Sequence, residues 1–116
     1  MMQVFLNIIN NAADVLKISP KENSHRYIKI SITNNDNNME IAIHDNGNGI
    51  PDTIINKIFE PYFTTKHQSQ GTGLGLYMTH QIIDKMGGKI KVQNEEFEFE
   101  NNTYFGANFV ICFPIN

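Results

Sequence analysis

The hydrophobic residues of this chain switch between helical and strand-like spacing, and this alternation restricts the fold more than any other feature. Apolar residues recur three or four positions apart over residues 2–17 and again over residues 74–86, which is the spacing of an amphipathic helix. Each helical segment is followed by two strand-like segments, at residues 28–32 and 39–43 and then at residues 89–92 and 104–113. The order predicts an α+β two-layer α/β sandwich with the helices on one face of a mixed or antiparallel sheet.

Turn-forming residues separate these segments. Residues 34–38 (NNDNN) predict a hairpin turn, and the two glycines at 87–88 predict the end of the second helix. A short helical pattern lies within residues 50–59, residues 60–73 predict a mobile loop, and residues 95–102 predict an acidic connection. Apolar residues of the two long helices are expected to meet the isoleucine-rich face of the sheet, which leaves the opposite side of the helix layer for a ligand.

Length, charge and cysteine content restrict the class of protein. A length of 116 residues fits one domain, since domains commonly hold about 100–150 residues. A net charge of −3 argues against electrostatic binding of nucleic acid or of an anionic membrane. No apolar run approaches the ~20 residues of a membrane-spanning helix. The single cysteine, Cys112, cannot form an intrachain disulfide, so we expect a cytoplasmic domain.

Two asparagines on the first helix are candidates for metal binding. Asn7 and Asn11 are four residues apart, so they lie on one face of a helix. An amide oxygen is a ligand that Mg²⁺ accepts beside water and phosphate oxygens. Asparagine is a mediocre helix former, which favours a functional role for this pair, whereas Asn10 is expected to face water.

A carboxylate beside two glycines follows the second predicted strand. Asp45 only accepts hydrogen bonds, which suits the exocyclic amine of adenine. Gly47 and Gly49 allow positive φ angles and close approach of the backbone to a flat ring. An ordinary Asp-Asn-Gly turn would also account for these residues.

The third candidate motif is a glycine-rich segment that leads into the second helix. The amides of Gly71, Gly73 and Gly75 could point at phosphate oxygens, helped by the positive end of the helix dipole. The segment is not a P-loop, because Leu74 and Leu76 stand where a lysine would follow the glycines. A flexible hinge with close helix packing is the alternative explanation, above all for Gly75.

Together these motifs resemble the boxes of sensor histidine kinases. Residues 3–12 (QVFLNIINNA) resemble the N box, 45–51 (DNGNGIP) the G1 box, 59–66 (FEPYFTTK) the F box and 71–76 (GTGLGL) the G2 box. The resemblance covers nearly the whole chain. It identifies residues 1–116 as similar to the catalytic, ATP-binding domain of a two-component histidine kinase, in the GHKL superfamily with the Bergerat ATP-binding fold.

The resemblance implies a role for each matching residue. Asn11 would coordinate Mg²⁺ with Asn7 beside it, Asp45 would bind the adenine amine, and Gly47 and Gly49 would shape the pocket. In the ATP lid, which the resemblance places at roughly residues 60–72, Lys66 is the candidate cation near phosphate. The residues that would surround the triphosphate are Gly71, Thr72, Gly73, Leu74 and Gly75.

The resemblance also implies a reaction and its partners. The γ-phosphoryl group of Mg-ATP would pass to a histidine on a separate dimerisation domain, and from there to a response regulator. None of the four histidines of this chain stands in the setting of a phospho-acceptor, so no catalytic residue is assigned within it. No contact with nucleic acid or membrane is implied.

The chain departs from the family pattern in places. Asp14 stands where many relatives carry a basic residue, and the strand or two that usually precede the N box are missing, so a domain truncated at its N-terminus is expected. Two alternative functions stay open. One is another GHKL ATPase, of the DNA-repair or topoisomerase type or an anti-sigma serine kinase, and the other is an interaction module deficient in nucleotide binding.

Overall fold

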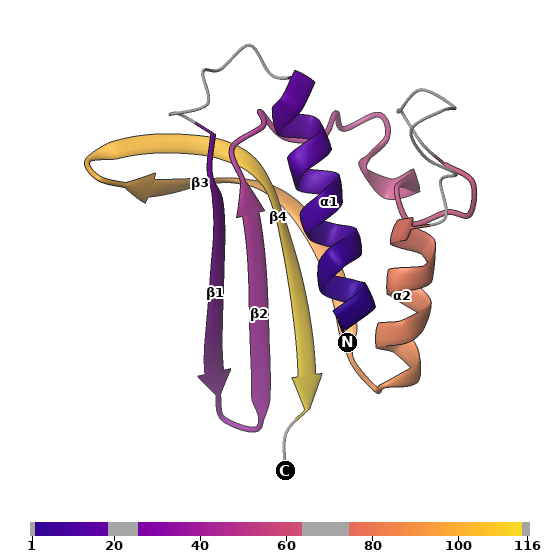
Figure 1. The fold of residues 1–116 in the computed structure, drawn as a ribbon. Helices are drawn as coiled ribbons and strands as arrows, with labels where there is room; N and C mark the ends of the chain where they lie inside the picture. Colours follow the sequence, from indigo (N-terminus) through magenta and orange to yellow (C-terminus); the bar gives the residue numbers. More distant parts are fainter. Residues whose placement is uncertain (1, 19–25, 64–74, 115–116) are drawn as a thin grey trace.

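The computed structural model describes residues 2–18, 26–63 and 75–114. Two helices lie on one face of a four-stranded antiparallel sheet whose strand order is β1-β2-β4-β3 (Figure 1). The elements in chain order are α1 (Met2–Ile18), β1 (Ile28–Asn35), β2 (Asn38–Asp45), the 3-10 turn η2 (Ile55–Lys57), α2 (Gly75–Lys85), β3 (Lys89–Phe99) and β4 (Asn102–Pro114). The predicted two-layer α+β architecture is confirmed, and the sheet is antiparallel throughout.

The core lies between α1 and the inward face of β2 and β4. Four residues of α1 spaced by four positions are buried, and they form one stripe along the helix: Val4, Ile8, Ala12 and Leu16. Alternation along β2 turns Ile41 and Ile43 inward, and Phe109 and Ile111 of β4 complete the same cluster. Burying one such side chain contributes roughly 1.5–3 kcal/mol, so this cluster holds the helix layer on the sheet.

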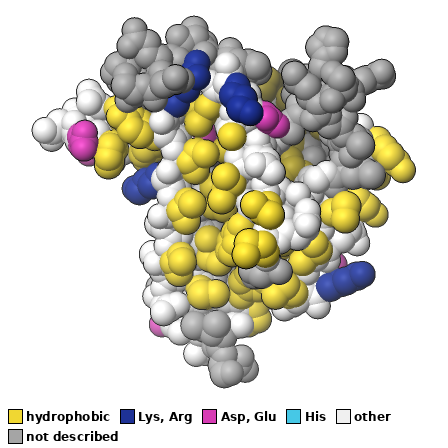
Figure 2. All heavy atoms as spheres, in the orientation of Figure 1, with side chains coloured by type: hydrophobic (Ala, Val, Ile, Leu, Met, Phe, Trp, Pro, Cys, Tyr) yellow, Lys and Arg dark blue, Asp and Glu magenta, His cyan; other side chains and the backbone are white. Residues whose placement is uncertain are grey.

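The first hairpin forms as predicted, but only part of its apolar face is covered. Asn35 pairs with Asn38 across a turn in which Asp36 adopts a φ of 54°. On β1, Ile30 and Ile32 are 54% and 65% exposed, contrary to the expectation that the helices meet the whole isoleucine-rich face. Because β1 is an edge strand and α1 packs on β2, hydrophobic side chains remain visible between β1 and α1 (Figure 2).

The second hairpin is longer than predicted. Residues 95–102 do not form an acidic connection, because β3 continues to Phe99 and β4 begins at Asn102. Only Glu100 and Asn101 lie between the strands, with φ angles of 49° and 66°, as expected for a two-residue turn that matches the strand twist. In Figure 1 the far end of this hairpin bends across the start of β1.

The second helix ends at the predicted glycines. Gly87 adopts a φ of 80°, and the amides of Gly88 and Gly87 donate to the carbonyls of Ile83 and Asp84 over 2.9 and 3.1 Å. This is the hydrogen-bond pattern of a Schellman motif. The helical pattern predicted within residues 50–59 is reduced to the three residues of η2, and residues 64–73 of the predicted loop lie outside the described residues.

Candidate functional site

Asp45 occupies the last position of β2, where the strand passes into a loop. Its side chain faces the helix layer and the residue is only 3% exposed. Burial raises the pKa of this carboxyl, while hydrogen bonds from the backbone amides of Gly47 and Ala107 act to lower it. The Gly47 amide donates to Asp45 Oδ1 over 2.8 Å. A buried carboxylate with remaining acceptor capacity is costly unless a further donor faces it.

The loop after Asp45 is attached to the surrounding strands at several points. Asn46 is fully buried, and its Oδ1 accepts a hydrogen bond from the Tyr27 amide over 2.9 Å. Asn48 and Gly49 both adopt positive φ angles, of 74° and 84°, and the Asn48 amide donates to the Phe105 carbonyl over 3.2 Å. The prediction of positive φ at the glycines therefore holds for Gly49 but not for Gly47, and it is Asn48 that shares the conformation of Gly49.

Sequence reasoning missed two residues of the second hairpin that shape this loop. Asn94 of β3 donates from Nδ2 to the Ile50 carbonyl over 2.7 Å and accepts at Oδ1 from the Ile50 amide over 2.8 Å. Gly106 of β4 lies against Asp45 so closely that a Cβ there would overlap the Asp45 carbonyl oxygen. The available signals were an amide at an inward position after Ile90 and Val92, and a glycine inside a strand.

The first predicted motif lies at the contact between the two helices. Asn7 donates from Nδ2 to the Gly75 carbonyl over 3.1 Å and to Thr79 Oγ1 over 3.0 Å. Its own Oδ1 accepts from Gln3 Nε2 over 3.1 Å. Asn11 is half-buried one turn further along the same face of α1. The structure therefore brings Asn7 to Gly75, and Asn10 is exposed as expected.

The predicted site residues thus fall into two described groups. Asp45, Gly47 and Gly49 share the loop after β2, while Asn7, Asn11 and Gly75 lie where α1 meets α2. Five further predicted residues lie outside the described residues: Lys66, Gly71, Thr72, Gly73 and Leu74.

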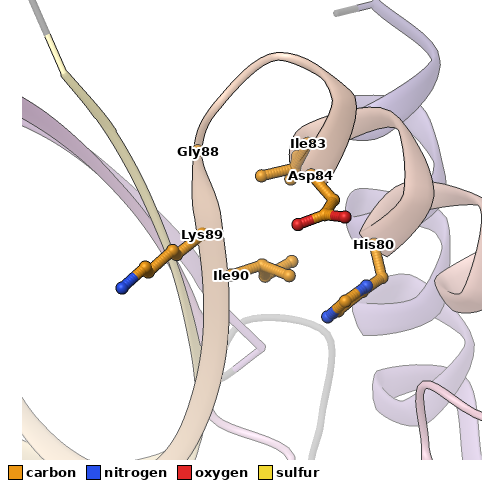
Figure 3. Close-up of a pocket in the computed structure, with 6 residues that line it drawn as sticks. All are labelled: His80, Ile83, Asp84, Gly88, Lys89 and Ile90. Carbon is orange, nitrogen blue, oxygen red and sulfur yellow. The ribbon is translucent and has the colours of Figure 1, made fainter.

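A cavity of about 240 Å³ lies away from both groups, between the end of α2 and the start of β3. Figure 3 shows His80 and Asp84 of α2 directed toward Ile90, with Lys89 extending away from them. None of the predicted site residues lines this cavity. It belongs to the packing of α2 on the edge of the sheet.

Two further properties concern the described residues only. Within residues 2–18, 26–63 and 75–114, no three His, Cys, Asp or Glu side chains come together as a metal-binding group. Neither α1 nor α2 has the length and apolar character that a membrane crossing requires.

Comparison with known proteins defines the class to which this fold and site belong. The sequence model of the "Histidine kinase-, DNA gyrase B-, and HSP90-like ATPase" family matches residues 1–116, and the chain belongs to this family. Within the family it is an ATP-binding domain of the sensor histidine kinase type, as its relatives show.

The relatives cover nearly all of this chain. It is 36% identical over 114 residues to the two-component sensor PprA of Pseudomonas aeruginosa, which covers 97% of this chain and 12% of PprA. It is 33% identical to the sensor histidine kinase ZraS of Escherichia coli, covering 98% of this chain and 21% of ZraS. The chain therefore spans a small part of the curated relatives that it matches.

Solved structures show the same fold. The catalytic domain of histidine kinase ThkA superposes with a TM-score of 0.73 at 35% identity, covering 97% of this chain and 64% of that one. The mycobacterial sensor histidine kinase MprB gives a TM-score of 0.72 at 27% identity, covering 97% of this chain and 68% of that one.

Proposed function

We propose that residues 1–116 act as one catalytic domain that binds Mg-ATP and donates the γ-phosphoryl group to a histidine on a separate dimerisation domain. A response regulator would receive the phosphoryl group from that histidine. The observation that carries the proposal is the Asp45 carboxylate, buried at the end of β2 beside a loop with two positive φ angles. The relatives are named as a two-component sensor and a sensor histidine kinase, and these names support the proposed class of reaction.

Asp45 is proposed to recognise the base. An ionised carboxylate has only acceptor sites, and one buried oxygen already accepts from Gly47. The exocyclic amine of adenine would supply a further donor and so reduce the cost of burying the charge. A 6-oxo purine would place an acceptor against the same carboxylate, so the arrangement favours adenine over hypoxanthine or guanine.

Asn11 is proposed to hold the magnesium ion. The donor set fits, because an amide oxygen is a hard ligand that suits Mg²⁺ when water and phosphate oxygens complete the octahedron. Asn7 is engaged by Gln3, Gly75 and Thr79, which makes it a support between the helices and leaves Asn11 for the metal. Bound Mg²⁺ would neutralise charge on the triphosphate.

The remaining contacts to the triphosphate are proposed from the family resemblance. Lys66 would place a cation near phosphate, and backbone amides would surround the phosphates at Gly71, Thr72, Gly73, Leu74 and Gly75. Catalysis in this scheme consists of positioning and charge neutralisation. We place the domain in the cytoplasm, where ATP and response regulators are available.

Phosphotransfer tests the proposal directly. The domain is mixed with γ-labelled ATP, Mg²⁺ and histidine-containing dimerisation domains taken from PprA, ZraS and ThkA, with Asp45→Asn as the inactive control. We expect label on the supplied domain that is stable to base and lost in acid, as a phosphohistidine is, and that Asp45→Asn does not produce. Acid-stable label on serine, or ATP hydrolysis without any transfer, would instead support a different ATPase of the family.

A further inference from the structure

The side chain of Asn94 holds the loop that follows Asp45, although it is 49 positions later in the chain. Its amide group donates to the Ile50 carbonyl over 2.7 Å and accepts from the Ile50 amide over 2.8 Å. Both polar groups of one backbone residue are therefore satisfied by one side chain. A neighbouring strand would satisfy the backbone of Ile50 in the same way, but Ile50 belongs to no strand.

The contact is close as well as reciprocal. A Cβ built at Gly49 would lie 2.7 Å from Asn94 Oδ1 and 3.0 Å from the Phe105 ring, so the loop approaches the hairpin at a distance that only glycine allows. The Asn48 amide bonds the Phe105 carbonyl on the opposite strand of that hairpin. Three consecutive loop residues, 48–50, are thus held by β3 and β4.

The chemistry of the side chain matters at this position. An amide is planar and carries one donor group and one acceptor, which matches the two backbone groups of Ile50. Aspartate has the same shape but would set an oxygen against the Ile50 carbonyl, and alanine would leave both backbone groups to find other partners. Leaving a part-buried polar group unsatisfied is expensive compared with the modest net gain of a hydrogen bond.

We propose that Asn94 is a positioning residue for base recognition, which keeps the loop of residues 45–50 in the conformation that presents the Asp45 carboxylate to the purine. This inference rests on the proposed contact between Asp45 and the adenine amine. Asn94 itself contacts the loop backbone, and it acts on the nucleotide through Asp45 and Gly49. Gly106 serves the same arrangement from β4, since its missing side chain leaves room for the Asp45 backbone.

The preference of the domain for one purine base over another distinguishes a positioning role of Asn94 from a general contribution to stability. Affinities for ATP and for inosine triphosphate, which carries a 6-oxo group in place of the amine, are measured by calorimetry on the wild-type domain, Asp45→Asn, Asn94→Ala, Asn94→Asp and Gln93→Ala. Gln93 is the adjacent amide of β3, exposed on the opposite face of the sheet, so its replacement is the matched control. Unfolding by urea is recorded for each variant.

We expect Asn94→Ala to lose about ten-fold in ATP affinity, which corresponds to roughly one hydrogen bond, and much less in inosine triphosphate affinity. The preference for ATP therefore shrinks in both Asn94 variants and is kept in Gln93→Ala. Equal losses for the two nucleotides, or an unchanged preference in a folded Asn94 variant, would overturn the inference. Should Asn94→Ala not fold, the near-isosteric Asn94→Asp decides by the same ratio.

The same data separate this inference from the function on which it rests. A wild-type domain that prefers ATP, and loses that preference in Asp45→Asn but not in the Asn94 variants, refutes the role of Asn94 alone. A wild-type domain with no preference between the two nucleotides refutes the Asp45 contact and the role of Asn94 together.

Discussion

Asp45 shows how one residue can be both costly to the fold and useful to the site. Its carboxylate is almost fully buried, and burial is the largest cause of its raised pKa. The amides of Gly47 and Ala107 offset part of that cost without removing it. Ionisable groups whose pKa is shifted by burial are typical of binding and catalytic sites.

The raised pKa gives a pH dependence with a definite sign. Because the folded-state pKa of Asp45 lies above the ordinary value of an aspartate carboxyl, the folded domain holds this proton more tightly than the unfolded chain does. The contribution of Asp45 to the free energy of unfolding is therefore most favourable below the unfolded pKa and falls as the pH rises through the folded pKa. Ligand binding has the opposite dependence, since the ionised carboxylate is a stronger acceptor for the adenine amine than the protonated carboxyl is.

We predict that the preference for ATP over inosine triphosphate decreases as the pH is lowered through the raised pKa of Asp45. A protonated carboxyl can donate to the 6-oxo group, whereas the ionised form repels it. Calorimetric affinities for both nucleotides between about pH 7 and about pH 4 check this, because phosphate ionisation affects the two ligands alike. A ratio that is independent of pH, or equally pH-dependent in Asp45→Asn, would contradict the assignment.

Among the individual site residues, the short sequence motifs predict some and miss others, and the difference has a physical reason. Asp45, Gly47 and Gly49 lie within five positions, so their chemistry is visible locally, and the structure places them on one loop. Asn94 and Gly106 act on that loop from 44 or more positions away. Their roles arise from strand pairing, because the pairing decides which residues meet. The local sequence around residues 45–50 does not encode that pairing.

At the scale of elements, Asn7 connects the two helices. It reaches from α1 to the first turn of α2, with hydrogen bonds to the Gly75 carbonyl and to Thr79 Oγ1. Thr79 is fully buried and donates in turn to the same Gly75 carbonyl over 2.9 Å. The start of α2 is therefore held by a small network of polar groups in addition to apolar packing.

We predict opposite effects from two neighbouring asparagines of α1. Asn7→Ala should lower the free energy of unfolding by about 1 kcal/mol, since the lost hydrogen bonds cost more than the ~0.6 kcal/mol gained in helix propensity. Asn10→Ala, at an exposed position of the same helix, should be neutral or stabilise by up to ~0.6 kcal/mol. Urea unfolding measures both, and equal effects of the two substitutions would show that the link to α2 contributes nothing.

The elements themselves were predicted unevenly. Both long helices and the first hairpin follow from apolar spacing and turn residues. The helices are confirmed within a residue, whereas β1 and β2 continue two or three residues beyond the predicted strand ends and leave a shorter turn. The strands of the second hairpin are longer than predicted, because the acidic residues within 95–100 suggest a solvated connection. In the structure their strand is stabilised by ring contacts, since Phe97 packs on His44 and Tyr104, and Phe99 packs on Tyr27.

For the whole molecule, the two helices cover β2, β4 and β3 more completely than β1. Ile30 and Ile32 remain exposed on the helix side of this edge strand. The general architecture followed from the order of helical and strand-like segments, whereas the extent of coverage depends on helix placement, which periodicity alone does not give. The two groups of candidate site residues lie on the part of the sheet that the helices cover. One group is the loop after β2, the other is the contact between α1 and α2, and both adjoin the hydrophobic core.

Binding of Mg-ATP through Asp45 is tested by a calorimetric titration of ATP into the domain, with and without Mg²⁺, beside Asp45→Asn. We expect saturable binding that Mg²⁺ strengthens and that Asp45→Asn reduces severely, because the substitution replaces an acceptor facing the adenine amine by a group that also donates. Absence of binding by a folded wild-type domain, or binding that is indifferent to both Mg²⁺ and Asp45→Asn, would contradict this expectation.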